Sequence, residues 1–395
     1  MNEIYLDHAA TTKLDERVLQ KMMPYFTEYY GNANSQHGMG RDAQKAVDEA
    51  RDEIAKLIGA QPNEIYFTSG GTEADNWVLR GICKALSHKG KHIITTKIEH
   101  AAMLSTAKEL EKEGYEFTFL NVDNEGFVDL TELEKSIRPD TILVSCMYAN
   151  NEIGTIEPIK KIAEIAHAHG VLCHTDAVQA MGAMRINVRD SGVDMMSFSA
   201  HKFNGPKGMG ALFIKTGVPV GRLISGGHQE RTRRGGTTNV PGVVGFAEAL
   251  RLTYETLDED VKHVAALRDR FVKRVLEEVP YVKFNGPKDM TKRLPNNADF
   301  SFEYIEGESI LFSLDLAGIA VSSGSACSSG SLEPSHVLLA IGVPEELAHG
   351  SIRFTFGKEN TEEEVDYTVE KIKETVERLR RMSPLFKLDG TLKEV

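Results

Sequence analysis

Short runs of β-forming residues alternate with longer amphipathic stretches over the first 215 residues of this 395-residue chain. Candidate strands lie at residues 64–69, 91–97, 115–122, 141–148, 170–176, 195–200 and 210–215. Helical patterns separate them, as at 101–114 and 159–170, and each of these two ends at a glycine, as helix C-caps do. Nearly continuous apolar strands with helices between them are typical of a mostly parallel sheet that is covered on both faces. We therefore expect an α/β fold with a mostly parallel, seven-stranded sheet.

The pattern changes near residue 260. A long charged helix is expected over 259–279, strands at 296–305 and 350–357, and a final charged helix over 362–382. We interpret this part as a second, smaller α+β unit. The expected division is a large domain over 15–259 and a small domain that combines 1–14 with 260–395.

The composition limits the classes of partner. The net charge is −12, from 46 basic and 58 acidic residues, and such a field repels nucleic acids and anionic membranes. The apolar runs are shorter than the roughly 20 residues of a membrane helix, and the first residues lack a signal-peptide pattern. We expect a cytoplasmic protein that binds neither membrane nor nucleic acid. Arg231, Arg233 and Arg234 form one local basic cluster, which is either a solvated loop or an anion site.

Polar residues follow the ends of the predicted strands, where a sheet of this kind binds its ligands. Thr72 suits the first turn of a helix, whose N-terminus can bind a phosphate or simply carry a cap. The other polar residues are His100, Asn151, Asp176, Gln179, Ser199, His201 and Lys202. Each of them alone is explained as well by a structural role. Their conjunction at one edge of one sheet indicates a binding site.

Pyridoxal phosphate requires this combination of groups. Its aldehyde condenses with a lysine, its pyridine nitrogen pairs with a carboxylate and its phosphate binds to a helix N-terminus. A nicotinamide site fits less well because no G-x-G-x-x-G opens a helix, and a P-loop is absent. Lys202 and Lys207 compete for the covalent role. We favour Lys202 because Lys207 lies in a Pro-Gly turn and is expected to point away from the strand end.

Motifs along the whole chain carry a resemblance to a known family. They include YLDHAATT, FTSGGTEADN, EHAAM, YANNEIGT, HTDAVQA, SFSAHKFNGPKGMGAL, RRGGTTNVPG, SSGSACSSG and SIRFTFG. The chain resembles the cysteine desulfurases of the NifS/IscS family (group I), which are fold-type I pyridoxal-phosphate enzymes related to class V aminotransferases. Such an enzyme takes sulfur from L-cysteine, leaves L-alanine and supplies iron–sulfur cluster assembly.

The resemblance implies a role for each matching residue. Lys202 would bind the coenzyme covalently, Asp176 would hold the pyridinium nitrogen, and His100 would stack on the ring and move protons. It also implies ring contacts from Asn151 and Gln179, phosphate contacts from Gly71, Thr72, Ser199 and His201, and a phosphate contact from Thr237 of a second subunit. The protein would therefore be a homodimer. Arg353 and Asn151 would bind the substrate, with the planar fork of Arg353 on its carboxylate.

The four cysteines differ in their surroundings. Cys83, Cys146 and Cys173 lie in apolar or helical stretches and are expected to be buried free thiols. Cys327 lies among serines and glycines, a composition that favours a mobile loop. On its own, such a cysteine is most simply a bystander. Beside a pyridoxal-phosphate site it suits a nucleophile that takes sulfur as a persulfide. The resemblance implies delivery to an iron–sulfur scaffold protein, with no resident metal and at most a transient contact between Cys327 and a cluster.

Three other functions stay open. A selenocysteine lyase or a class V aminotransferase would use the same coenzyme-binding residues. The aminotransferase would need a keto-acid acceptor, whereas a desulfurase yields alanine together with sulfur bound to Cys327. A sulfur carrier without enzymatic activity would explain the cysteine alone.

Overall fold

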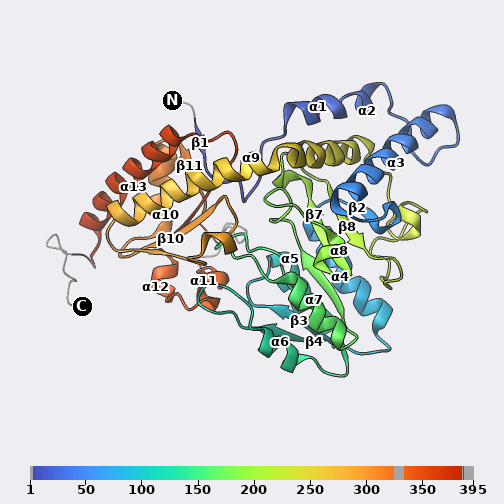
Figure 1. The fold of residues 1–395 in the computed structure, drawn as a ribbon, viewed down its shortest axis with the longest axis horizontal. Coiled ribbons are helices and arrows are strands. Elements are labelled where there is room, and N and C mark those ends of the chain that lie inside the picture. Colours follow the sequence, from blue (N-terminus) through green and yellow to red (C-terminus); the bar gives the residue numbers. More distant parts are fainter. Residues whose placement is uncertain (1–2, 324–332, 385, 387–395) are drawn as a thin grey trace.

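The computed structural model describes residues 3–323, 333–384 and 386. Its central feature is a seven-stranded sheet with the strand order β2-β8-β7-β6-β5-β3-β4 (Figure 1). The strands are β2 (Ile65–Thr68), β3 (His92–Thr96), β4 (Glu116–Leu120), β5 (Thr141–Ser145), β6 (Leu172–Asp176), β7 (Met195–Ser199) and β8 (Gly210–Ile214). Only β8 runs antiparallel to its two neighbours. The predicted α/β fold with a mostly parallel sheet is confirmed, and the ends of each strand lie within three residues of the expected ones.

Helices cover both faces of this sheet because adjacent residues of its buried strands point in opposite directions. Leu143 packs in a core with Trp77 of α4 (Gly71–Leu86), whereas its neighbour Val144 packs in another core with Ile162 of α7 (Ile159–Ala168). The remaining helices around the sheet are α1 (Glu16–Met22), α2 (Pro24–Thr27), α3 (Gly38–Ile58), α5 (Ala101–Lys112), α6 (Leu130–Ser136) and α8 (Val188–Ser191). The continuous apolar character of the strands follows from this double coverage.

A second hydrophobic core lies in the C-terminal part and includes Leu6, Phe271 and Phe300. Its antiparallel sheet has the order β12-β10-β9, and a two-stranded parallel sheet joins β1 to β11. The strands are β1 (Ile4–Tyr5), β9 (Val282–Phe284), β10 (Asn297–Phe302), β11 (Ile319–Ala320) and β12 (Ser351–Thr355), and the helices are α10 (Gly307–Leu316), α11 (His336–Ala340), α12 (Glu345–Ala348) and α13 (Glu362–Met382). The N-terminal strand thus packs with the C-terminal part, while the exact domain limits stay a prediction.

The longest helix, α9, joins the two parts. It spans 39 residues, Val240–Glu278, and crosses from one core to the other (Figure 1). The helix expected from residue 259 therefore begins 19 residues too late. Pro241 and two glycines make the earlier segment resemble a loop, but a Cβ at Gly245 would lie 2.5 Å from Met22 Sδ. The glycine permits close packing between helices there and does not end the helix.

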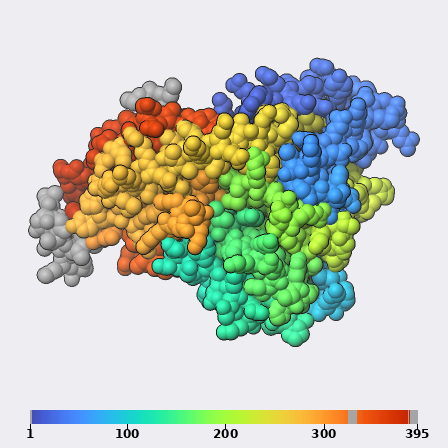
Figure 2. Space-filling model, in the orientation of Figure 1, coloured from blue at the N-terminus to red at the C-terminus, as the bar shows by residue number. Residues whose placement is uncertain are grey.

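Figure 2 shows the two parts side by side, with the residues of α9 extending over both. Within the described ranges, we find no helix that combines the length and the apolar character required to cross a bilayer.

Candidate active site

Ten of the residues predicted for the site line a single cavity of about 280 Å³ at the carboxyl ends of the parallel strands. They are Gly71, Thr72, His100, Asn151, Asp176, Gln179, Ser199, His201, Lys202 and Arg353. We call this space the strand-end cavity. Asp176 and Ser199 are the last residues of β6 and β7, which pair side by side in the sheet. The expected gathering of polar residues at one sheet edge is therefore present, whereas their chemical roles are a separate question.

Lys202 ends a short 3₁₀ turn that follows β7 directly. Its Nζ donates hydrogen bonds to the main-chain oxygens of Ala9 and Ala10, the latter at 2.8 Å. Gln179 Nε2 also donates to the oxygen of Ala9, at 2.9 Å. A segment near the N-terminus thus forms one wall of the strand-end cavity and holds the lysine amine beside it.

Asp176 is a buried carboxylate at the end of β6. Burial raises its pKa from the ordinary value, and the charges of His100 and Lys202, together with a 2.9 Å hydrogen bond from the Val178 amide, act in the other direction. A positive group entering the cavity would therefore favour the ionised form of Asp176.

His100 is the N-cap residue of α5. Its Nδ1 accepts a 3.1 Å hydrogen bond from the Ala102 amide, which fixes the orientation of the ring. With Nδ1 used as an acceptor, Nε2 carries the proton of the neutral ring. The ring thus lines the cavity in a defined tautomer.

The start of α4 forms another part of the site. Gly71 and Thr72 are its first two residues, and Ser199 and His201 line the same region. The pKa of His201 is lowered to about 4, first by burial and then by the charges of Lys202 and Lys207, so its imidazole is neutral near pH 7. Its Nδ1 lies 3.1 Å from Thr11 Oγ1. Uncharged donors and a helix N-terminus are a suitable environment for an anion.

Lys207 does not line the strand-end cavity, but it lies closer to the site than its Pro-Gly turn suggested. Lys207 lines an adjoining open cavity of about 420 Å³ together with Thr72, Ser199 and His201. Its Nζ donates to the oxygen of Thr12 at 3.2 Å. The Pro-Gly turn reverses the chain after Lys202, and this brings Lys207 to the helix end of the site. The two lysines thus lie in different parts of it.

Arg353 reaches the strand-end cavity from β12, in the other part of the molecule. Its Nη1 donates to the main-chain oxygen of Asn151 at 3.1 Å, and its Nη2 forms an ion pair with Asp7 at 2.9 Å. The side chain is buried, and among the described residues its Nε has no hydrogen-bond partner. An unpaired buried donor at a cavity wall is available to a ligand.

Two predicted site residues are not brought to this cavity. Thr237 lies in a separate cavity of about 230 Å³ with Ser69 and Arg234. Cys327 lies outside the described residues, so its predicted role is neither supported nor opposed by the structure. The other three cysteines are buried, as expected, and burial raises the pKa of each thiol.

The basic cluster at 231–234 has structural partners. Arg234 forms a two-point ion pair with Glu73, at 2.8 and 3.0 Å. Arg231 lies 4.3 Å from the centroid of the Tyr66 ring and donates to the oxygen of Ile65 at 2.8 Å. These contacts favour the solvated loop over the anion site, because Arg231 and Arg234 already have partners within the protein.

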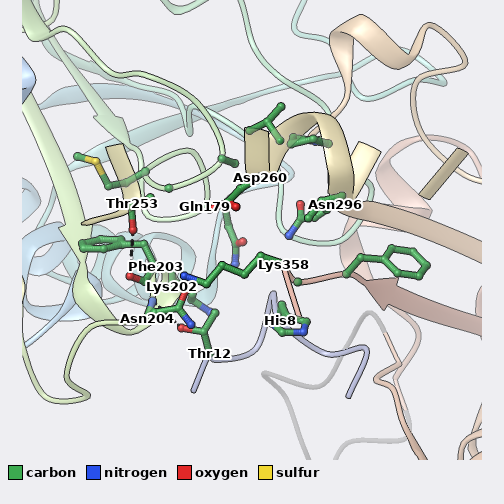
Figure 3. A pocket seen from close by; sticks show the side chains of 18 of the residues that line it. His8, Thr12, Gln179, Lys202, Phe203, Asn204, Thr253, Asp260, Asn296 and Lys358 are labelled. Carbon is green, nitrogen blue, oxygen red and sulfur yellow. Dashed lines mark hydrogen bonds between the residues drawn. The ribbon is translucent and has the colours of Figure 1, made fainter. Parts of the chain in front are cut away.

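A further cavity, of about 90 Å³, shares Gln179 and Lys202 with the strand-end cavity (Figure 3). Its labelled residues come from the N-terminal segment (His8, Thr12), the turn after β7 (Phe203, Asn204), α9 (Thr253, Asp260) and the C-terminal part (Asn296, Lys358). Its apolar lining belongs to both cores, with Met181 and Phe203 from one and Val264 and Phe356 from the other. Lys202 therefore lies where the two cores meet.

Several residues of the site escaped the sequence reasoning. The strand-end cavity is also lined by Ala9, Ala10, Asp75, Met147, Ala149 and Val178. The oxygens of Ala9 and Ala10 belong to the main chain, and no side-chain pattern reveals them. Asp75 carried a usable signal, because it lies three residues after Thr72 on the same helix and so shares its face.

Comparisons with known proteins agree with this geometry. The profile of the family described as "Aminotransferase class-V" matches residues 4–368. The chain is 52% identical over 384 residues to "Cysteine desulfurase IscS" of Clostridium botulinum, covering 97% of both chains. It is 53% identical over 382 residues to the protein of the same name from Dictyoglomus turgidum, covering 97% of this chain and 96% of the relative. A solved "NIFS-LIKE PROTEIN" superposes with a TM-score of 0.90 at 42% identity, over 95% of this chain and 100% of that one. The chain therefore belongs to the class V aminotransferase family and, within it, to the cysteine desulfurases of the IscS and NifS kind.

Proposed function

We propose that this protein is a pyridoxal-phosphate-dependent cysteine desulfurase that converts L-cysteine to L-alanine and carries the sulfur as a persulfide on Cys327. One observation carries the proposal: Lys202 and Asp176 line the same cavity of about 280 Å³, together with His100, the N-cap residue of α5, and the N-terminus of α4. An amine, an acid, an aromatic ring and an anion site are the four groups that this coenzyme requires.

The residues around the cavity fit the coenzyme. A Cβ at Gly71 would lie 2.7 Å from Val178 Cγ2, so only glycine leaves the wall between α4 and the β6 turn as it is. This lets main-chain N–H groups of the first turn of α4 approach a phosphate. Asp176 is buried where a protonated pyridine nitrogen would compensate its charge. The adjoining open cavity lined by Thr72, Ser199 and His201 gives the phosphate end room.

When bound, the coenzyme withdraws electrons from the α-carbon of the substrate. Lys202 Nζ is the group that would hold the coenzyme between turnovers and, once released, would take the α-proton and return it to the product. Asp176 would keep the ring nitrogen protonated. Asn151 and Gln179 are placed to orient the ring substituents, and Gly71, Thr72, Ser199 and His201 would hold the phosphate.

Arg353 would bind the substrate carboxylate. Its unpaired Nε and its Nη2 can present two parallel donors, which match the two oxygens of a carboxylate. His100 would transfer a proton near the sulfur atom through its Nε2. The Cys327 thiolate would attack that sulfur. The C–S bond breaks, an S–S bond forms, and the electron pair left on the carbon skeleton is protonated on the way to alanine.

The assembly and its partners belong to the same proposal. Thr237 would complete the phosphate site of a second subunit, which makes the protein a homodimer, and an iron–sulfur scaffold protein would accept the sulfur. A cytoplasmic location stays a prediction.

The test is an incubation of the purified protein with L-cysteine and pyridoxal phosphate. We expect equal amounts of alanine and of sulfur. Before reductant is added, the Cys327 peptide should carry an adduct of about 32 Da, the mass of one sulfur atom. Transfer of the amino group from cysteine to an added keto acid, with no release of sulfur, would instead support an aminotransferase. Selenocysteine as the preferred substrate would support a lyase.

A further inference from the structure

Three carboxyl groups are buried together at the strand-end cavity, and two of them line it. Asp75 and Glu99 are each 1% exposed and Asp176 is 6% exposed. They come from α4, from the segment before α5 and from β6. Because like charges in a buried site repel one another strongly, the three cannot all be ionised.

The contacts of Asp176 favour its ionised form. Burial raises the pKa of Asp176, whereas His100, the Val178 amide and Lys202 all act to lower it and so stabilise a negative charge. Glu99 is held differently: its Oε1 accepts hydrogen bonds from the Met147 amide at 2.8 Å and from Thr96 at 3.0 Å.

The contacts of Asp75 favour a neutral acid. Its acidic neighbours are the carboxyl groups of Asp176 and Glu99, and burial raises the pKa of Glu99 to about 8. Burial, and then these two groups, raise the pKa of Asp75 well above the ordinary value, against one hydrogen bond with Ser197. His174 Nε2 lies 3.9 Å from Asp75 Oδ1. That pair is not ionic, because burial lowers the pKa of His174 to about 3.

His174 belongs to a row of polar side chains across the sheet. Its Nδ1 lies 2.8 Å from Ser145 Oγ on β5, and its Nε2 lies 3.0 Å from Ser197 Oγ on β7. A neutral imidazole can donate at one nitrogen and accept at the other, so the two serines satisfy it completely. The row therefore offers Asp75 hydrogen-bonding groups and no positive charge. Among the described residues, Asp75 Oδ1 lacks a hydrogen-bond partner.

We propose that Asp75 and Asp176 act as one pair of carboxyl groups with a single negative charge, in which Asp75 is the neutral, positioning member and Asp176 is the charged member that meets the pyridine nitrogen. This inference rests on the proposed function for the identity of the ring. It extends that function by assigning a role to Asp75. The pair presents one negative charge to one protonated nitrogen, and a second charge would remain uncompensated in the buried site.

The pair has a consequence that needs no coenzyme. In the unfolded chain both carboxyl groups are ionised at neutral pH, whereas in the folded apoprotein Asp75 holds a proton. The folded state then binds one proton more than the unfolded state. Stability conferred by this proton is present at low pH and is lost as the pH rises from the ordinary aspartate range through the folded pKa of Asp75.

The experiment is urea unfolding of the apoprotein at several pH values between 5 and 8 for the wild type and for Asp75→Asn. The asparagine is neutral and has the shape of the acid. We expect the ratio of the two folding constants, wild type over variant, to fall as the pH rises towards the folded pKa of Asp75, by at most about tenfold for each pH unit. Asp194→Asn is the control for losing a buried aspartate, because the Asp194 carboxylate faces Lys215 at 3.7 Å and His167 at 2.8 Å. It should retain the pH dependence of the wild type above pH 7.

A ratio that does not change with pH would overturn the proposal, because Asp75 would then be ionised in the folded state. If Asp75→Asn does not fold, Asp75→Ser gives the same test with a smaller neutral side chain, and the same outcomes apply.

Coenzyme binding supplies a second measurement. We expect Asp176→Asn to raise the dissociation constant of pyridoxal phosphate by tenfold or more and Asp75→Asn to raise it by a smaller factor, since one pKa unit corresponds to a tenfold change. Equal losses in the two variants would contradict the assignment of neutral and charged members. Failure of the wild type to bind pyridoxal phosphate would overturn the proposed function and leave the result for the apoprotein standing.

Discussion

Asp7 Oδ1 and Arg353 Nη2 lie 2.9 Å apart, so the first strand region and β12 meet in an ion pair at the wall of the strand-end cavity. The two residues are 346 positions apart in the chain. Because Nη1 is used by the Asn151 oxygen and Nη2 by Asp7, the guanidinium plane is fixed before any substrate binds. These contacts explain how one arginine from the C-terminal part is held at the wall of a cavity built on the central sheet.

Replacing Arg353 by lysine tests the substrate contact. Lysine keeps the charge but cannot form two parallel hydrogen bonds to a carboxylate. We expect the KM for L-cysteine to rise by tenfold or more, which corresponds to about 1.5–3 kcal/mol for a charge-assisted hydrogen bond. The dissociation constant of pyridoxal phosphate should change little. Asp7→Asn should raise KM less, since it loosens Arg353 without removing it. Equal KM values for the wild type and Arg353→Lys would remove Arg353 from the substrate site.

Absorption spectroscopy should distinguish the roles of Lys202 and Lys207. Lys202→Ala is expected to abolish both turnover and the visible absorption band of a lysine-bound coenzyme, because no other amine takes its place. Lys207→Ala is the matched control, since Lys207 lines the adjoining cavity and not the strand-end cavity. It should keep the visible band and weaken coenzyme binding only severalfold, through the loss of a positive charge near the phosphate end. A normal band in Lys202→Ala would disprove its covalent role.

The sulfur carrier is tested by replacing Cys327 with serine. We expect the visible band and coenzyme affinity of the wild type, together with loss of the persulfide adduct and of most alanine formation, because serine cannot take up the sulfur. Cys83→Ser is the control: Cys83 is buried, and burial raises the pKa of its thiol to about 12, so it is almost never a thiolate at neutral pH. Persulfide that persists in Cys327→Ser would identify another acceptor.

The close approach at Gly71 should control coenzyme binding. Gly71→Ala places a methyl group 2.7 Å from Val178 Cγ2, and relief of this clash must move the start of α4 or the turn after β6. Equilibrium titration should show a dissociation constant for pyridoxal phosphate that is higher by tenfold or more. The double variant Gly71→Ala/Val178→Ala removes the clash and should recover much of the affinity. An unrecovered loss would mean that glycine is needed for its backbone alone.

Glu157 should make the apoprotein less stable at alkaline pH. Its carboxyl group is buried, its Oε2 accepts a 3.3 Å hydrogen bond from the Val128 amide, and burial raises its pKa to about 8. Because the folded pKa exceeds that of the unfolded chain, the stabilising proton is fully bound below about pH 4.5 and is lost as the pH rises through about 8. Glu157→Gln should therefore be favoured over the wild type by an amount that grows with pH, reaching on the order of 4 kcal/mol near pH 8. Urea unfolding at pH 5 and pH 8 measures it, and parallel profiles for the two proteins would contradict the prediction.

Much of the fold was predictable because its signals are local. Each of the seven sheet strands appears as an apolar run, and α13 begins where Thr361 and Glu364 form a capping box and ends at Met382 as expected. The start of α9 was missed for the opposite reason: Gly245, near its start, is required by the close approach of Met22 on α1, which no local pattern records.

For the candidate site, too, local signals in the sequence predicted some positions and not others. Residues directly after strands, such as Asp176, Ser199 and Lys202, could be expected at one edge of the sheet because parallel strands end together. The position of Lys207 could not, since it depends on how the turn after Lys202 folds back onto the start of α4.

The sequence by itself determined the α/β class, the strands and helices that carry the polar residues, and the family resemblance, because hydrophobic periodicity, caps and motifs are encoded by neighbouring residues. Only the tertiary structure decided that Asp7 meets Arg353, that Asp75 lies beside Asp176 with a neutral His174 behind it, and that Lys202 lies between two cores. These relationships join residues on different elements, and the packing of one element against another sets their distances, burial and charge states.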